Sequence, residues 1–237
     1  MELGGWSVRR GVVAAVVLAS VPVWFAVSAE AGDAGRCERF VAGSAERAAL
    51  VTGSGTETLV IGDSWAAGLG LADLGDSWPT RLPGRVQVAS FSGSGFSHGA
   101  SECGDVSFAS RASAALTPTT ELVVVEGGLN DFDRTDAEIA AGFARLAAAL
   151  GEAVSERRVV VVGPAPAPSR ADAVRRVDGL LGQLAEAAGW EYVSAYGWGL
   201  GYLPDQLHLT PEGHREFGDL VAAALAERRV KAVGGHG

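Results

Sequence analysis

The sequence predicts an α/β protein, a three-layer α/β/α sandwich on a flavodoxin-like, five-stranded parallel sheet. Short β-branched runs alternate with longer amphipathic patterns, which is typical of doubly wound folds. The runs are almost continuously apolar, as expected for strands that are buried on both faces. They lie at residues 58–61, 86–89, 121–126, 158–162 and 191–194.

Three helices follow from their start signals. Thr135 and Glu138 form a capping box ahead of a periodic apolar stripe, and Ser169 with Asp172 resembles a second helix start. The pair Thr210–Pro211 opens a last helix, because proline is well suited to the first helical position. Helices of this kind between the strands complete the two outer layers.

The first 31 residues are predicted to be a signal peptide. Arg9 and Arg10 precede an apolar stretch at 11–27, and Ala29-Glu30-Ala31 offers small residues for cleavage. The alternative is an uncleaved membrane anchor formed by residues 11–27. We therefore expect a secreted, extracellular protein, with membrane contact only through this segment if it is retained.

One compact domain is expected after the signal. The chain has 237 residues, 48% of them hydrophobic, which is enough for one full core. We expect an N-terminal segment at 32–57, the main domain at 58–229 and a disordered tail at 230–237. The net charge is −9 without a cluster of Lys or Arg, so no nucleic-acid partner is expected.

The two cysteines, Cys37 and Cys103, form an even pair in a chain that we expect to be exported. A disulfide between them is the simplest interpretation. Two unrelated buried thiols are the alternative.

Chemically suggestive residues follow the predicted strands. Ser64 closes Gly-Asp-Ser after the first strand, Asn130 follows the third, and Asp205-x-x-His208 precedes the last helix. Ligands bind at the carboxyl ends of strands in such folds, so these residues should converge. A hydroxyl, an imidazole, a carboxylate and hydrogen-bond donors are the parts of a nucleophilic acyl-transfer site.

These motifs, with Gly93 after the second strand, resemble the four sequence blocks of the SGNH/GDSL hydrolase family over residues 58 to about 227. The resemblance implies that Ser64 is the nucleophile, His208 the general base and Asp205 the residue that orients the ring. It also implies an oxyanion hole formed by the amides of Ser64 and Gly93 and the side chain of Asn130. It implies no metal and no other cofactor.

Two assignments have competitors in the sequence. A second Gly-Asp-Ser ends at Ser77, but no strand precedes it, and Ser77 is expected to cap a short helix beginning at Trp78 or Pro79. Gly95 competes with Gly93 for the oxyanion position, and the spacing after the strand favours Gly93.

Other residues also have predicted roles. Trp65, His98, Trp198 and Tyr202 are candidate substrate-binding residues, and Trp65 is expected to narrow the acyl pocket towards short acyl groups. His214 is expected on the exposed side of the last helix. Asp63 and Asp131 are expected to be structural, with hydrogen bonds to backbone in their turns.

The expected function is that of a secreted serine esterase. Its substrate would be a small ester or an acylated carbohydrate or lipid, hydrolysed through an acyl-serine intermediate. Two alternatives remain open: an acyltransferase that uses the same residues, and a non-catalytic carbohydrate- or envelope-binding module.

Overall fold

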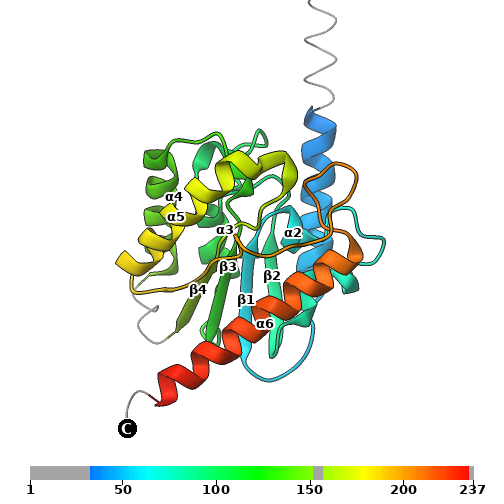
Figure 1. Cartoon of the computed structure of the whole chain (residues 1–237). Coiled ribbons are helices and arrows are strands. Elements are labelled where there is room, and N and C mark those ends of the chain that lie inside the picture. The colour runs from blue at the N-terminus through cyan, green and yellow to red at the C-terminus, as the bar shows by residue number, and fades with distance from the viewer. Residues whose placement is uncertain (1–32, 152–156, 235–237) are drawn as a thin grey trace, which may run out of the picture. The chain divides into compact units, whose positions relative to one another are not determined.

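The computed structural model of the chain describes residues 33–151 and 157–234 (Figure 1). The expected signal peptide at 1–31 lies outside the described residues. The chain divides into two compact units, one ending at Arg39 and one beginning at Phe40. A helix spans residues 33–49. The second unit contains the sheet and all of the candidate site residues.

The sheet has the five predicted strands in the order β2-β1-β3-β4-β5, with every neighbouring pair parallel. This confirms the predicted fold class. The order places β1 and β3 next to each other in the sheet, with β2 beyond β1. The strands are β1 (Glu57–Gly62), β2 (Arg85–Ser90), β3 (Leu122–Glu126), β4 (Arg158–Val162) and β5 (Glu191–Val193).

Two apolar clusters fill the space on the two faces of the sheet. Successive residues of β1, such as Val60 and Ile61, contribute to opposite clusters, as the pleat of a strand requires. One cluster includes Phe217 of the long α6 (Pro211–Gly234), which crosses the sheet in Figure 1. The other contains Phe108 and Phe143, from helices on the opposite face. Each face of the sheet is therefore covered by an apolar cluster of its own.

The helices include all three that the sequence predicts, which are α4, α5 and α6, with α2 and α3 in addition. The α-helices are α2 (Ser64–Ala67), α3 (Phe108–Ala115), α4 (Asp136–Leu150), α5 (Ala171–Ala187) and α6 (Pro211–Gly234). Short 3₁₀ helices span Leu74–Asp76, Trp78–Arg81, His98–Ala100, Leu129–Asp131 and Pro168–Arg170.

The predicted start signals can be compared with the residues at which the helices begin and end. Thr135 and Glu138 form the expected capping box at the start of α4, and α6 begins at Pro211, where the Gly213 amide donates to Thr210 Oγ1. Ser169 was expected near the start of α5, but it lies in a 3₁₀ turn, and Arg170 precedes α5 without a side-chain cap. At the other end, α6 continues to Gly234, so part of the tail expected at 230–237 is helical.

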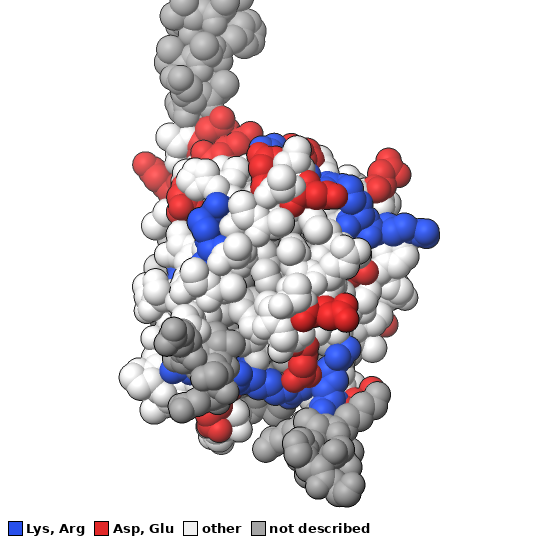
Figure 2. Space-filling view, turned by 90° about the vertical axis from the view of Figure 1, so that its left-hand side faces the viewer, with Lys and Arg blue, Asp and Glu red and all other residues white. Residues whose placement is uncertain are grey.

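Both cysteines are disulfide-bonded, as the even count predicted. Among residues 33–151 and 157–234, no helix is long and apolar enough to cross a membrane. The segment 11–27, named above as a potential anchor, is not among the described residues. In the view of Figure 2, acidic and basic side chains are mixed towards the margins, with a large uncharged area between them.

Candidate functional site

The turn after β1 presents Ser64 at the carboxyl edge of the sheet. Ser64 is the first residue of α2, and the Asp63 carboxylate accepts a 2.9 Å hydrogen bond from the Trp65 amide. The helix ends after one turn because Gly68 adopts a left-handed conformation, with φ of 74°. This sharp strand-to-helix turn leaves 6% of Ser64 exposed at the surface.

Ser64, His208 and Asp205 form a chain of hydrogen bonds. His208 Nε2 lies 3.1 Å from Ser64 Oγ, and His208 Nδ1 lies 2.6 Å from Asp205 Oδ2. The other carboxylate oxygen, Oδ1, accepts the amides of Leu207 and His208 at 3.0 Å each. The carboxylate is therefore held by its own loop and in turn orients the imidazole towards the serine hydroxyl.

The Asp205 side chain is 49% exposed, whereas that of His208 is 16% exposed. Burial alone would raise the pKa of Asp205, but hydrogen bonds from the His208 ring and from two amides outweigh it. They lower the pKa of Asp205 to about 2. The residue is therefore ionised across the neutral range, as a partner for an imidazolium must be.

Three hydrogen-bond donors belong to the segments that follow β1, β2 and β3: the amides of Ser64 and Gly93 and the side chain of Asn130. Among the described residues, the backbone amides of Ser64 and Gly93 donate to no acceptor. Asn130 Nδ2 donates to the Ser94 carbonyl at 2.8 Å and faces Asp63 Oδ2 at 3.3 Å. The hydrogen bond to Asp63 is the longer of the two. The amide hydrogen that makes it is therefore the one more easily diverted to another acceptor.

The surroundings of Gly93 and Gly95 differ. Gly93 has φ of 83°, and a Cβ there would have no neighbour closer than 3.8 Å. A Cβ on Gly95 would lie 2.5 Å from Asp131 Oδ2, and the Gly95 carbonyl accepts from the Phe108 amide. Gly95 therefore allows close packing, while Gly93 allows a left-handed turn at a position where a Cβ would make only ordinary contacts.

Two carboxyl groups are buried below the serine. Burial raises the pKa of Asp63 to about 6, and the hydrogen bond from the Trp65 amide opposes that rise. Burial also raises the pKa of Glu126, at the end of β3, well above its ordinary value, and the nearby Asp63 adds to the effect. Glu126 is not among the residues predicted for the site, although an acid that ends an apolar strand is a visible signal.

Asp131 has the structural role that the sequence predicts, although its partners lie in a different loop. Its carboxylate accepts the backbone amides of Phe96 and Ser97 at 2.9 Å each. Burial raises its pKa, against the effect of these hydrogen bonds. Asp131 thus joins the loop that carries Asn130 to the loop after β2.

Trp65 does not line an open pocket, contrary to expectation. The residue is 1% exposed, its ring packs edge-on against Phe217 at 5.3 Å, and its Nε1 donates to the Leu207 carbonyl at 3.1 Å. Tyr202 contacts the Trp65 ring at 6.1 Å, and burial raises the pKa of Tyr202 to about 12. Trp198 is partly buried against Phe217 at 5.5 Å. Through Trp65 Nε1, this group of rings is joined to the loop that carries His208.

The remaining histidines differ from each other in environment. His98 is 65% exposed and pairs with Asp105 at 3.3 Å, in the loop after β2. His214 was expected at the surface of α6, which is wrong: it is fully buried. Burial first, and then the nearby His208, lower the pKa of His214 to about 4. The sequence pattern misplaced it because histidine is compatible with either face of a helix.

Ser77, the serine of the second Gly-Asp-Ser, is fully buried ahead of the short helix that begins at Trp78. Its hydroxyl donates back to the Leu74 carbonyl at 2.7 Å and makes no capping bond to that helix. The predicted helix is therefore confirmed, while the predicted side-chain cap is wrong.

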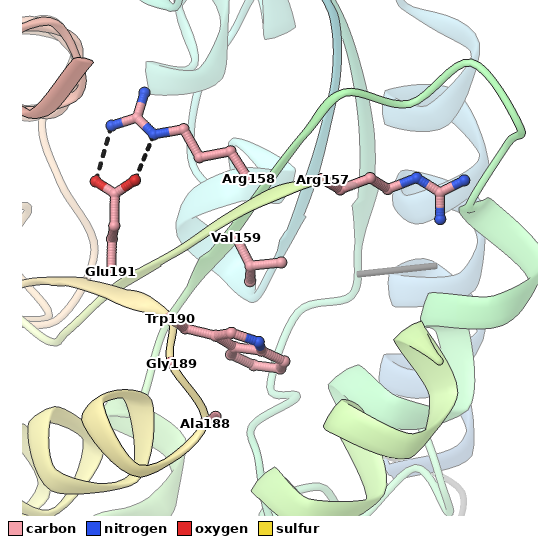
Figure 3. Close-up of a pocket in the computed structure, with 7 residues that line it drawn as sticks. All are labelled: Arg157, Arg158, Val159, Ala188, Gly189, Trp190 and Glu191. Atoms are coloured by element: carbon pink, nitrogen blue, oxygen red, sulfur yellow. Dashed lines mark hydrogen bonds and ion pairs between the residues drawn. The ribbon is translucent and has the colours of Figure 1, made fainter. Parts of the chain in front are cut away.

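A hollow of about 340 Å³ lies at the opposite edge of the sheet, where β4 and β5 begin (Figure 3). Arg158 forms a two-pronged ion pair with Glu191 there, and Arg157 points away to the Thr117 and Thr120 carbonyls. These arginines are engaged by the protein itself. Among the described residues, no three side chains of metal-ligating type come together.

Comparison with known proteins agrees with this architecture. A model of the GDSL-like lipase/acylhydrolase family matches residues 60–216. The chain therefore belongs to that family, which confirms the resemblance and makes it an ester hydrolase by class. A comparison with curated proteins gave no match.

Solved structures share the fold. Est24, a carbohydrate acetylesterase from Sinorhizobium meliloti, is 20% identical with a TM-score of 0.59, covering 73% of this chain and 99% of its own. An aryl esterase from M. smegmatis is 18% identical, with a TM-score of 0.55 and the same coverage. AlinE4, an SGNH-hydrolase family esterase, is 23% identical with a TM-score of 0.50, covering 74% and 97%.

Proposed function

We propose that the protein is a secreted serine esterase that hydrolyses short-acyl carboxylic esters through an acyl-serine intermediate. The observation that carries the proposal is the continuous chain from Asp205 through His208 to Ser64, with distances of 2.6 and 3.1 Å. These separations suit proton transfer between a nucleophile and its base.

In the first half of the reaction, Ser64 Oγ attacks the ester carbonyl while His208 Nε2 accepts the hydroxyl proton. Asp205, which is ionised at neutral pH, stabilises the imidazolium through Nδ1–H. The imidazolium then gives its proton to the departing alkoxide, which leaves as the alcohol. Water enters and loses a proton to His208 as its oxygen attacks the acyl carbon. The imidazolium then returns this proton to Ser64 Oγ as the bond from Oγ to the acyl carbon breaks, which releases the acid.

The oxyanion of each tetrahedral intermediate needs preorganised donors. The unpartnered amides of Ser64 and Gly93 are two candidates among the described residues. Asn130 supplies a third when its long contact to Asp63, at 3.3 Å, yields to the oxyanion. Removal of one such donor typically costs about 3 kcal/mol of transition-state stabilisation.

The proposed substrate class rests on the activity of a structural neighbour. Est24, which shares the fold, is a carbohydrate acetylesterase, and an acetyl or similar acyl group on a carbohydrate is our preferred substrate. Trp65 does not support a preference for short acyl groups, because its ring is buried and does not line an acyl pocket. Secretion is supported by the apolar stretch at 11–27 and by the disulfide.

The test is turnover of p-nitrophenyl esters of increasing acyl length by the purified protein, with Ser64→Ala and Ser77→Ala as a matched pair. We expect Ser64→Ala to lower kcat by at least ~10³-fold and Ser77→Ala to leave per-site turnover unchanged. A fluorophosphonate should label only proteins that retain Ser64. The absence of both turnover and labelling in the wild type would instead favour a non-catalytic binding module.

A further inference from the structure

Arg111 of α3 extends from the helix to the loops at the carboxyl edge of the sheet. One terminal nitrogen donates to the Ala89 carbonyl at the end of β2. The other donates to the Gly62 carbonyl at 3.2 Å and to Ser94 Oγ at 2.8 Å. Nε donates to the Val106 carbonyl at 3.3 Å. One side chain thus contacts the ends of two strands and the loop that follows the second.

The guanidinium carries its charge among neutral acceptors. Among the described residues, Arg111 forms no ion pair with a carboxylate, although Asp63 is near enough to favour its charged form. Burial lowers the pKa of Arg111 to about 10, which leaves it protonated at neutral pH. A desolvated cation satisfied mainly by carbonyl groups is costly to keep, so its position calls for an explanation.

Two of the four acceptors of Arg111, Gly62 and Ser94, lie next to candidate oxyanion donors in the chain. Gly62 is two residues before Ser64, and Ser94 directly follows Gly93. The Ser94 carbonyl also accepts Asn130 Nδ2 at 2.8 Å. Through Gly62 and Ser94, the guanidinium is therefore linked to the segments that bear all three donors.

We propose that Arg111 is a positioning residue that holds the three oxyanion donors in register and places a positive charge beneath them. This inference rests on the proposed esterase function. The planar guanidinium offers several donors in fixed directions, which a lysine ammonium cannot reproduce. Donors that are misplaced by a fraction of an ångström lose much of their effect on a developing charge.

The test separates positioning from simple folding. We would compare Arg111→Lys, which keeps the charge, with Arg111→Met, which keeps only the aliphatic stem. Ser94→Ala removes one hydrogen-bond acceptor of Arg111, Ser94 Oγ, without changing α3. Arg85→Lys is the control, since Arg85 pairs with Glu57 at the far end of β1 and β2.

Fluorophosphonate titration counts the competent sites, so kcat is expressed per labelled site. We expect per-site kcat to fall at least tenfold in Arg111→Lys and further in Arg111→Met, with KM changed less than threefold. Inhibition by an alkyl boronic acid, which mimics the tetrahedral intermediate, should weaken in parallel with kcat/KM. Ser94→Ala should show a smaller loss of the same kind, and Arg85→Lys none.

Unchanged per-site kcat in Arg111→Lys and Ser94→Ala would overturn the inference while leaving the esterase function intact. So would a loss that appears only as fewer labelled sites, because Arg111 would then serve folding alone. If Arg111→Met does not fold, the per-site kcat values of Arg111→Lys and Ser94→Ala still decide whether Arg111 is a positioning residue. A wild type that neither labels nor turns over would remove the proposed function and this inference with it.

Discussion

Trp65 Nε1 donates a hydrogen bond to the carbonyl oxygen of Leu207 across 3.1 Å. Trp65 directly follows Ser64 and Leu207 directly precedes His208, so this bond joins the neighbours of two candidate catalytic residues. The edge-on packing of the indole against Phe217 fixes the donor in place. The loop that carries His208 is therefore tied to the turn that carries Ser64 through a buried side chain.

Replacing Trp65 by phenylalanine should keep much of the packing and remove this bond. We expect a loss of about 1 kcal/mol in the free energy of unfolding, the usual value of one hydrogen bond. We also expect a fall in kcat of about tenfold as the His208 loop loosens. KM and acyl-length preference should stay unchanged, because the ring is buried. Ester assays with urea unfolding test this, and a shift towards longer acyl chains would instead return Trp65 to the acyl pocket.

Asp205→Asn should lower kcat by about 10²-fold or more, because a neutral amide stabilises the imidazolium poorly and favours the wrong ring tautomer. The half-exposed position of Asp205 allows water to replace part of the effect. Since the pKa of Asp205 is about 2, we expect no inflection from this residue above pH 4. A pH profile of kcat/KM for both proteins tests the prediction, with Asp219→Asn as an exposed control. Near-normal activity of Asp205→Asn would remove Asp205 from the triad.

Gly93→Ala and Gly95→Ala should have opposite signatures. Alanine at Gly95 would place its Cβ 2.5 Å from Asp131 Oδ2, so we expect about 2 kcal/mol of destabilisation. Alanine at Gly93 has space but must keep φ near 83°, a cost of about 1 kcal/mol. Any shift of this turn moves the Gly93 amide, so kcat should fall more in Gly93→Ala than in Gly95→Ala. Urea unfolding with per-site kcat would reveal the reverse ranking if Gly95 were the donor.

His214 should make the protein less stable at mildly acidic pH. Its pKa is about 4 in the folded protein against 6.5 for the free side chain, so the unfolded chain binds the proton first as the pH falls. The contribution of neutral His214 to the free energy of unfolding is complete above pH 6.5 and is lost progressively between pH 6.5 and 4. By linkage, the loss from pH 7 to pH 5 is about 2 kcal/mol.

Two buried carboxyl groups also make the free energy of unfolding depend on pH, in the direction opposite to His214. Asp63 and Glu126 have raised pKa values, so their protonation favours the folded state over much of the same range. His214→Phe retains both carboxyls and removes the imidazole. The wild type should therefore lose about 2 kcal/mol more than this variant between pH 7 and pH 5. Equal losses in urea unfolding at the two pH values would show that His214 does not titrate as described.

The strands and the order of the motifs could be read from the sequence because they depend on local patterns. Continuous β-branched runs require burial on both faces of a sheet, and the observed strands match those runs closely. The capping box at Thr135 is likewise a local device. The placement of Ser64 and Asn130 after strands follows from the same patterns, as does their convergence at one edge.

Contacts between distant segments decided the rest. Trp65 and Leu207 are 142 residues apart, and Arg111 meets Gly62 across 49 residues. No periodicity in the sequence specifies such a pair, and α3 itself was not predicted. The sequence alone determined which groups could carry out ester chemistry. The tertiary structure decided how they are held, because a buried indole, guanidinium or imidazole takes its role from the neighbours that exclude water around it.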